Sequence, residues 1–268
     1  MPRLFASKLS HIILFIGISI MVIPVWMIFA SSTHTSSFIN THGLQFFLGD
    51  SFQENYLRVL LYKGGFFKEI TALKMFLNSF IMATGVAMLS VVTSLMAAYA
   101  LVYYRTKYAT FLFWLIFITI LVPLELRIFP TYSVMAKLNL VNSYFGLIVP
   151  ISASAIATLF FRQFYRTVPD ELLESAKLDG ASTWRFFIDF LVPLSRTMIV
   201  AMFIFMFVFG YNQYLWPLLV TSSEQYWTVV MGLKMMSGSI VHRFAFVIMS
   251  MVPPCLLYTS DAADEEDS

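Results

Sequence analysis

The stretch that decides the fold is Met75–Tyr104, which reads MFLNSFIMATGVAMLSVVTSLMAAYALVYY. None of its thirty residues is charged. A helix of roughly 20 apolar residues crosses a bilayer core about 30 Å thick. This stretch is therefore long enough to cross the membrane with a tilt or to extend beyond it, and we predict a transmembrane helix here.

The composition of the whole chain extends this prediction. Of the 268 residues, 59% are hydrophobic and only 12% are charged, whereas about a quarter of the residues of a soluble domain are charged. So few charges leave too little polar surface to cover a water-soluble body of this size. The composition therefore excludes a soluble enzyme, a disordered protein and a nucleic-acid binder with a basic face, and it indicates a polytopic membrane protein.

Five further apolar runs accompany this helix. They lack the alternation of a membrane β-barrel, and lipid cannot satisfy exposed backbone groups, so each run is expected to be helical. The last run is interrupted by Pro253 and Pro254. The sequence predicts an all-α membrane protein, a six-span helical bundle with a truncated sixth span. The other runs are His11–Ala30, Phe111–Phe129, Tyr144–Phe164, Met198–Val220 and one that begins near His242.

The first run could instead be a cleaved signal peptide, because Arg3 and Lys8 precede it. It is longer than the apolar region of a signal peptide and lacks a clean cleavage site, so we favour an uncleaved span. Lysine and arginine are densest in the short segments that a cytoplasmic N-terminus would place inside the cell, which favours that orientation. The long outer loop, about 31–74, is expected to be lid-like or re-entrant, with a short surface helix over Leu57–Tyr62.

The last fourteen residues, Cys255–Ser268, differ from the rest of the chain. They read CLLYTSDAADEEDS and contain five of the fifteen acids but no lysine or arginine. An acidic cytoplasmic tail is one interpretation. We favour another, because the string resembles a translated sequencing adaptor and begins within an apolar span: residues 1–254 form the membrane domain, and residues 255–268 are a non-native tail. Without this tail the net charge rises from +2 to +7 and no cysteine remains.

The most informative loop is Thr167–Pro193, which reads TVPDELLESAKLDGASTWRFFIDFLVP. Thr167 is expected to cap a first helix, whose positive N-terminal dipole favours Asp170 and Glu171 in its first turn. Gly180 stands where a glycine commonly ends a helix. The sequence therefore predicts a first short helix that ends just before Gly180.

A second helix is expected to follow, capped by Ser182 or Thr183, with Pro193 marking the start of the fifth span. A short rigid helix tied to two spans could act as a lever for a soluble partner. It could equally be an amphipathic helix that lies on lipid headgroups. The physics of this loop leaves both interpretations open.

The spacing of this loop resembles the "EAA" loop of the ABC importer permeases. Glu174-Ser175-Ala176 is followed after two residues by Asp179-Gly180-Ala181, and then by Phe187 and Pro193. Ser175 departs from the family, which usually has alanine at that position. The resemblance implies that this helix–turn–helix is a cytoplasmic coupling helix that docks in a cleft of an ATPase subunit. The residues carried over to that role are Glu174, Ala176, Asp179, Gly180 and Ala181.

The resemblance covers nearly the whole of residues 1–254, the expected permease domain. The six-span plan, the Leu77-Asn78-Ser79 segment and the Asn212–Leu218 run resemble the MalG-type branch of carbohydrate permeases. The segments Phe117–Thr131 and Phe160–Tyr165 look closer to the permeases of sn-glycerol-3-phosphate uptake.

This resemblance implies a multi-pass subunit of an importer in the bacterial inner membrane, not an enzyme. The implied partners are a second homologous permease, two ATP-binding subunits, an extracytoplasmic substrate-binding protein and membrane lipid; nucleic acid is not among them. No phosphate-cradling G-x-x-x-x-G-K-[ST] motif occurs in the chain. ATP and magnesium are therefore expected on the partner subunits, with no cofactor on this chain.

Two charges fall near the outer end of the third span, Glu125 and Arg127. Charges within a membrane are costly and are usually paired or functional. At positions i and i+2 of a helix the two side chains do not face each other, so each needs another partner. Arg127 could form a bidentate contact with a phosphate group, or it could pair with a neighbouring span or subunit.

The fifth span carries Asn212 and Gln213 beside Trp216. Amides next to aromatic rings suit the recognition of polyols and sugars, but they also suit packing between helices. We keep Glu125, Arg127, Asn212, Gln213 and Trp216 as candidates for the substrate path. Gly210 and Pro217 favour a kink near the amides, as Pro123 and Pro130 do near the charged pair.

Three other functions remain as alternatives. A permease for a sugar or oligosaccharide belongs to the same class. An ion-driven secondary transporter requires buried acids in the spans, for which only Glu125 is a candidate, and it would not need a coupling loop. A membrane enzyme requires a catalytic constellation that this sequence does not offer.

Overall fold

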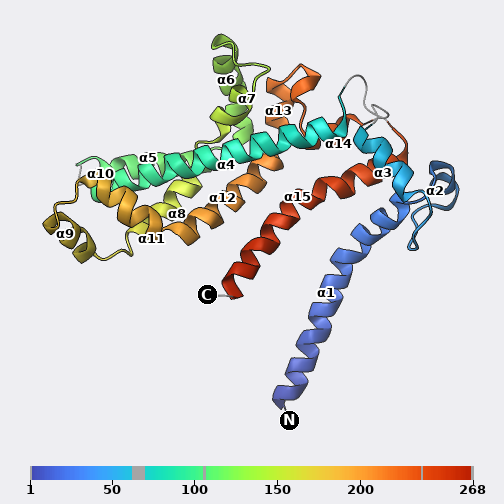
Figure 1. The fold of residues 1–268 in the computed structure, drawn as a ribbon, viewed down its shortest axis with the longest axis horizontal. Coiled ribbons are helices and arrows are strands. Elements are labelled where there is room, and N and C mark those ends of the chain that lie inside the picture. Colours follow the sequence, from blue (N-terminus) through green and yellow to red (C-terminus); the bar gives the residue numbers. More distant parts are fainter. Residues whose placement is uncertain (1, 62–69, 105–106, 237, 267–268) are drawn as a thin grey trace. The chain divides into compact units, whose positions relative to one another are not determined.

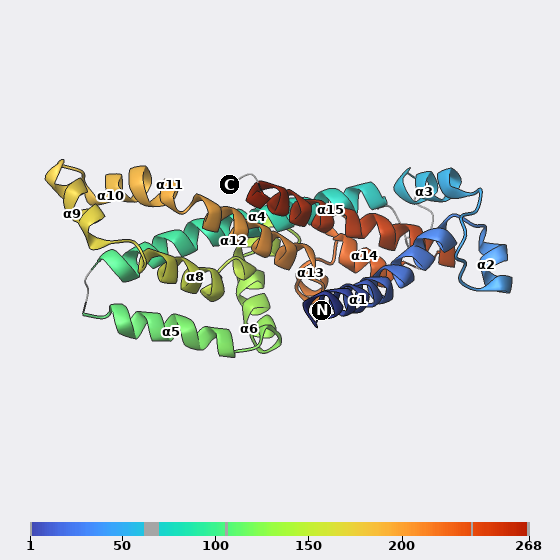
Figure 2. The same cartoon turned by 90° about the horizontal axis from the view of Figure 1, so that it is seen from below.

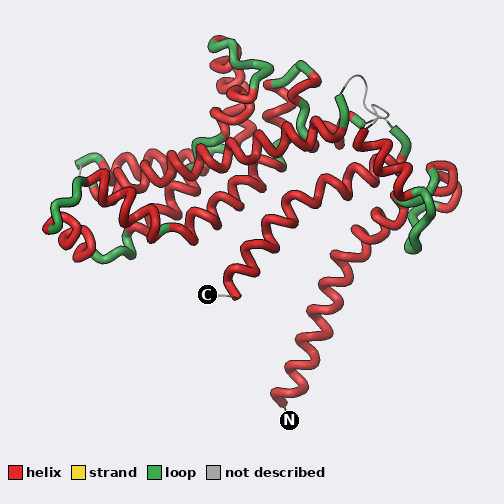
Figure 3. The backbone as a smooth tube through the Cα atoms, in the orientation of Figure 1, coloured by secondary structure: helices red, strands yellow, loops and turns green. Residues whose placement is uncertain are grey.

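The computed structural model describes residues 2–61, 70–104, 107–236 and 238–266. These residues form helices and loops, with no strand among them (Figures 1 and 3). The predicted all-α fold is confirmed. The predicted surface helix over Leu57–Tyr62 is found as α3, which begins earlier, at Phe52. Tyr62, the last residue of the predicted surface helix, lies outside the described residues.

The chain forms two compact units. Unit 1 comprises residues up to Phe76 and Val229–Cys255, and unit 2 comprises Leu77–Thr228 and the residues from Leu256 onward. The elements with residues in unit 1 are α1 (Pro2–Ser32), α2 (Ser36–His42), α3 (Phe52–Leu61), the start of α4 (Ala72–Tyr103), α14 (Val229–Met235) and most of α15 (Ile240–Glu266).

Unit 2 contains the rest of α4 and the segments between α4 and α14. They are α5 (Ala109–Leu121), α6 (Leu124–Lys137), α7 (Tyr144–Ile148), the 3-10 turn η1 (Val149–Ile151), α8 (Ala155–Tyr165), α9 (Asp170–Leu178), α10 (Thr183–Phe186), the π-helix η2 (Phe187–Leu191), α11 (Val192–Leu194), α12 (Arg196–Tyr211), α13 (Leu215–Val220) and the 3-10 turn η3 (Glu224–Tyr226).

Two of the predicted spans are continuous helices. The apolar part of α1 is His11–Ser32, and α4 is a continuous helix over Ala72–Tyr103 whose one charged residue is Lys74. Both are long enough to cross a bilayer. The predictions for the first and second spans therefore agree with the structure to within three residues at each end.

The third and fourth spans are each broken near a proline. The third divides into α5 and α6 at Val122 and Pro123. The fourth divides into α7 with η1 and then α8, with a bend of 49°. A proline lacks an N–H and its ring clashes with the carbonyl four residues earlier, so a regular helix ends near Pro123 and tightens at Pro150. The kink at Pro123 was predicted, the break after Pro150 was not, and Pro130 lies within α6 without ending it.

The fifth span is not the continuous helix predicted over Met198–Val220. Helix α12 ends at Tyr211, and α13 begins only at Leu215. The ring of Pro217 disfavours a helical carbonyl at Gln213, which accounts for the break. This break supports the kink that Gly210 and Pro217 predicted, but it shortens the expected helix. At its other end α12 is bent by 75° from the segment Thr183–Leu194.

The sixth span is not interrupted where the sequence predicted. Pro253 and Pro254 lie inside α15, which continues to Glu266. Prolines within a helix remove hydrogen bonds and bend it, but the helix can resume after them. The apolar part, Ile240–Pro254, remains shorter than the other spans. A boundary after Pro254 between a native domain and a foreign tail stays a prediction.

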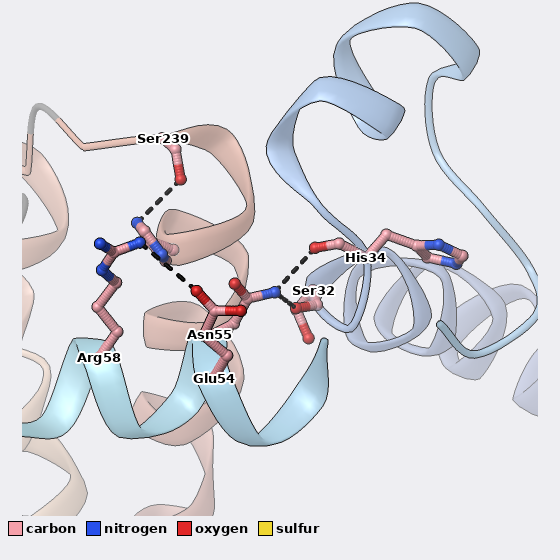
Figure 4. Close-up of polar contacts among 7 residues, drawn as sticks. Ser32, His34, Glu54, Asn55, Arg58 and Ser239 are labelled. Atoms are coloured by element: carbon pink, nitrogen blue, oxygen red, sulfur yellow. Dashed lines mark hydrogen bonds and ion pairs between the residues drawn. The ribbon is translucent and has the colours of Figure 1, made fainter. Parts of the chain in front are cut away.

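In unit 1 an asparagine fixes α3 to the end of α1. The Asn55 amide Nδ2 donates to the backbone carbonyl oxygens of Ser32 and His34, each at 2.8 Å (Figure 4). The hydroxyl groups of Ser32 and Tyr56 lie 2.9 Å apart. Burial raises the pKa of Tyr56 despite this hydrogen bond, which lowers it. Tyr56 therefore stays protonated and can keep its contact with Ser32.

Helix α4 contributes residues to both apolar clusters of unit 2. The first cluster joins α4 to α7, α12 and α13 through Met82, Val86, Leu147, Phe207 and Trp216. The second joins α4 to α8 and the segment 167–193 through Leu95, Tyr99, Phe161, Ala176 and Phe187. A displacement of α4 therefore affects both ends of unit 2.

Two serines of α4 hold the broken fourth span. The Ser90 hydroxyl donates to the carbonyl oxygen of Ser152 at 2.5 Å, and the Ser94 hydroxyl donates to that of Ser154 at 3.2 Å. Both serines are buried. Backbone groups released by a break must find new partners within the membrane; the Ser90 hydroxyl supplies one for Ser152, and the Ser94 hydroxyl adds a bond to the Ser154 carbonyl, which also accepts the Thr158 N–H.

The break is also supported by α13. Pro150 has no N–H to donate to the Gly146 carbonyl, and the indole N–H of Trp216 donates to that oxygen instead, at 3.1 Å. At the far end of α4, the buried Asn78 amide donates to the carbonyls of Gln225 and Trp227, at 2.8 and 2.9 Å. Side-chain donors thus connect α4 and α13 to segments that are distant in the sequence.

We predict that Gly146→Ala destabilises the chain. A Cβ at this position would collide with the backbone carbonyl oxygen of Leu140, which cannot rotate away. Overpacking of this kind costs about 1–3 kcal/mol and would lower the midpoint of thermal unfolding in detergent by roughly 2–10 °C. Gly17→Ala is the matched control, because nothing lies within 4 Å of its added Cβ. Equal midpoints for the two variants would contradict the assigned contact.

Candidate coupling loop and substrate cavity

The first helix of the loop begins later than the sequence predicted. Helix α9 starts at Asp170, with Pro169 at its N-cap. The predicted N-cap at Thr167 is wrong, because the Thr167 hydroxyl donates to the carbonyl of Phe164 at 2.7 Å and so helps to end α8. Asp170 and Glu171 occupy the first turn of α9 as predicted, where the helix dipole favours their charge.

Gly180 ends this helix in a Schellman motif. The Gly180 N–H donates to the Lys177 carbonyl at 3.0 Å, and the Ala181 N–H donates to the Ala176 carbonyl at 2.9 Å. These are the two bonds that define the motif. The motif also requires the residue directly after the helix cap to adopt the left-handed conformation. Gly180 has φ +75° and meets this need without a Cβ penalty.

The motif turns the small residues of the loop inward and its acids outward. Ala176 is 2% exposed, and Ala181 packs against the same apolar cluster. Glu174 and Asp179 are exposed. The five coupling candidates thus lie within eight consecutive residues at the end of α9 and the turn after it, with Ala176 and Ala181 packed inward and both acids exposed.

Exposed apolar side chains flank this turn. Leu178 is 88% exposed and Trp184 is 55% exposed. The second helix is capped as one of the two predicted alternatives, since the Ser182 hydroxyl accepts the Arg185 N–H at 3.2 Å. Large apolar groups beside charged ones are typical of a surface that binds another protein.

The loop joins α12 through irregular helix. Figures 1 and 2 show α9 and α10 at the end of unit 2 where α4 ends. Helix α10 passes into the π-helix η2, and the buried Ser195 marks the bend before α12. Tyr99 of α4 lies against this path: its hydroxyl donates to the Thr183 carbonyl at 2.7 Å, and its ring centroid is 4.8 Å from that of Phe187.

A cavity of about 280 Å³ lies where three broken spans meet in unit 2. It is bordered by the α5–α6 break, the break before α8, and α12 with Trp216 of α13. Arg127 contributes a cationic side chain to its lining. The N-cap of α8, Ser154, and the first residues of that helix contribute the positive end of a helix. The cavity therefore offers polar groups suited to an anion among apolar walls.

Trp216 lines the cavity but is 1% exposed, and its indole N–H is engaged with Gly146. Its ring can offer the cavity an apolar surface, and its N–H supports the broken fourth span. Arg127 differs, because it is exposed and forms no ion pair with another described residue. Of the five substrate-path candidates, these two share a cavity.

The other three candidates lie outside the cavity lining. Glu125 is exposed on α6. Asn212 is exposed at the end of α12, and the Gln213 amide donates to the Phe209 carbonyl at 3.3 Å. Their place on a substrate path stays a prediction. Among the described residues, no group of three or more His, Cys, Asp or Glu side chains could hold a metal ion.

Several polar residues that organise the site were not singled out from the sequence. Ser90 and Ser94 are four residues apart in an apolar helix, which places them on one face and was the available signal. Asn142 has φ +57°, and its amide oxygen accepts the N–H groups of Ser222 and Ser223 at 2.7 and 2.8 Å. No local pattern indicates these partners, which lie 80 residues away.

The sequence is similar to known transport proteins over most of its length. Residues 90–260 match the family described as "Binding-protein-dependent transport system inner membrane component". The chain is 38% identical over 263 residues to the sn-glycerol-3-phosphate transport system permease protein UgpE of Brucella melitensis, covering 95% of this chain and 93% of that protein. It is 39% identical to UgpE of Pectobacterium atrosepticum over 254 residues, covering 92% and 90%.

The fold is also found in a solved structure. A chain of a bacterial ABC transporter involved in the import of the acidic polysaccharide alginate matches with a TM-score of 0.82. The match covers 96% of this chain and 95% of that one, at 20% sequence identity. At this identity the likeness shows the fold alone.

We predict that Gly180→Ala loosens the end of α9. A residue with a Cβ in the left-handed region costs about 1–2 kcal/mol, and asparagine tolerates that region better than alanine. Amide hydrogen exchange of peptides covering residues 170–182 should therefore accelerate by roughly fivefold or more in Gly180→Ala, and less in the control Gly180→Asn. Unchanged exchange in Gly180→Ala would contradict the Schellman assignment.

Proposed function

Because this chain belongs to the family of binding-protein-dependent transport system inner membrane components, we propose that it is the permease subunit of an importer for sn-glycerol-3-phosphate. It is a transport subunit, not an enzyme, and it works with ATPase and binding-protein components. The observation that carries the choice of substrate is Arg127 in the cavity at the three broken spans.

The chemistry of the cavity supports a small phosphorylated substrate. A guanidinium group offers a planar pair of donors that matches a phosphate, and it keeps its charge at any physiological pH. The exposed Arg127 has no anionic partner among the described residues, so its donors are free for a ligand. The curated relatives of B. melitensis and P. atrosepticum are named for sn-glycerol-3-phosphate transport, which agrees with this chemistry.

The loop 167–193 is the proposed contact with the ATPase. Glu174 and Asp179 present charge, and Leu178 presents an apolar side chain, on the outer face of α9. A cytoplasmic N-terminus places this loop in the cytoplasm, where the ATPase subunits bind ATP and magnesium. Closure of the ATPase dimer on ATP would push α9, and unit 2 would transmit this movement to the broken spans around the cavity.

The proposed assembly contains a second, homologous permease and two ATPase subunits. An extracytoplasmic binding protein would deliver substrate to the outer face. The cavity of one chain would then form one half of the path across the membrane. A sugar or oligosaccharide importer is the alternative outcome of the transport experiment, and ATP-independent uptake would indicate a secondary transporter.

We predict that Arg127→Ala lowers the uptake of labelled sn-glycerol-3-phosphate by at least tenfold in proteoliposomes that contain the whole importer. The loss of a charge-assisted bidentate contact costs about 1.5–3 kcal/mol, which corresponds to roughly 10–150-fold in affinity. Arg127→Lys keeps the charge but loses the planar pair of donors, so its uptake should be intermediate.

Lys137→Ala is the matched control, because Lys137 is an exposed cation of the same helix outside the cavity. Co-purification of the other subunits measures assembly in each variant. Normal uptake by an assembled Arg127→Ala complex would reject the assigned role. Uptake of maltose but not of glycerol-3-phosphate by the unaltered complex would reject the substrate.

A further inference from the structure

Helix α4 carries a polar attachment to the coupling loop. Tyr99 is 4% exposed, and its hydroxyl donates to the Thr183 carbonyl oxygen at 2.7 Å. Thr183 is the first residue of α10, which follows α9 and its Schellman turn. The same ring contacts Phe187, the first residue of the π-helix. Tyr99 therefore holds the loop where regular helix changes into π-helix.

This attachment resists separation of α4 from the loop. Tyr99 is buried, and a buried hydroxyl that loses its partner costs free energy. The aromatic contacts around it add packing that also depends on close approach: Tyr103, the next tyrosine of α4, lies with its ring 5.5 Å from that of Phe186. If the loop moved and α4 did not, these contacts would be lost. Movement of α4 together with the loop therefore costs less free energy.

The same helix is attached to the cavity. Ser94 and Ser90 lie five and nine residues before Tyr99, and their hydroxyls bind the carbonyls of Ser154 and Ser152. At 1.5 Å per residue, Ser90 is about 14 Å along the helix from Tyr99. Ser154 lines the cavity. Between these attachments α4 has neither a break nor a proline.

We infer that α4 is the rod that carries movement of the coupling loop to the cavity, and that Tyr99 is the positioning residue that joins the rod to the loop. A covalent route also exists, from the loop through Ser195 into α12, but it passes through a π-helix and a 75° bend. The route through α4 passes through a continuous helix with a hydrogen bond at each end. Side-chain substitution can interrupt this route while the covalent one stays intact.

This inference rests on the proposed coupling of the loop to an ATPase, and Tyr99→Phe tests it. Phenylalanine keeps the ring contacts and removes the hydroxyl. The measured quantity is the number of substrate molecules imported per ATP hydrolysed by the complete reconstituted complex. We expect this ratio to fall about five- to tenfold, the effect of one lost hydrogen bond, while ATP hydrolysis stays within about twofold.

Tyr103→Phe is the matched control on the same helix. The Tyr103 hydroxyl donates to the Tyr165 carbonyl of α8 at 3.5 Å and not to the loop, so the ratio should stay within about twofold. The double variant Ser90→Ala, Ser94→Ala removes the attachments at the other end of the rod. Its ratio should fall as that of Tyr99→Phe does.

An unchanged ratio in Tyr99→Phe, or an equal fall in Tyr103→Phe, overturns the inference. If the Tyr99→Phe complex does not assemble, the variant Ser90→Ala, Ser94→Ala is used as the test. An unchanged ratio of imported substrate to hydrolysed ATP in that variant also overturns the inference. The unaltered complex is first assayed with glycerol-3-phosphate and with maltose, and the substrate it imports is used throughout. A wrong substrate assignment is thereby detected separately and leaves the test of Tyr99 intact.

Discussion

The structure depends on one constraint: in lipid, every backbone donor and acceptor must find its partner within the protein. Continuous helices meet this constraint internally, as α1 and α4 do. Three spans of this chain are broken, and the break in the fourth span leaves carbonyl oxygens that side chains of other elements satisfy. The Trp216 indole satisfies Gly146, and the Ser90 hydroxyl satisfies Ser152.

These donors come from elements that are far away in the sequence. Trp216 is 70 residues from Gly146, and Ser90 is 62 residues from Ser152. The break in the fourth span is thus stabilised by α4 and α13, and these elements are held in turn by their bonds to it. This mutual dependence explains why polar side chains recur along α4, an otherwise apolar helix. They fix its register against the spans that it supports.

The sequence predicts what is decided locally. Length and hydropathy locate α1 and α4, and the Gly180 and Ser182 signals locate the turn and the second cap of the coupling loop. The late start of α9 was missed because the Thr167 hydroxyl donates backward to the Phe164 carbonyl instead of capping α9. The cavity was missed as a unit, since its lining comes from four separate segments. Only Arg127 and Trp216 could be chosen in advance from it, by chemical type.

The third span exposes two charged side chains on α6. Glu125 and Arg127 are both exposed on α6, and neither forms an ion pair with another described residue. Charged groups at membrane depth do not remain in contact with acyl chains, because desolvation without a partner is too costly. Each of these two side chains must therefore meet water or another protein chain. This requirement agrees with the proposed assembly, in which a second permease subunit would complete the path that Arg127 lines.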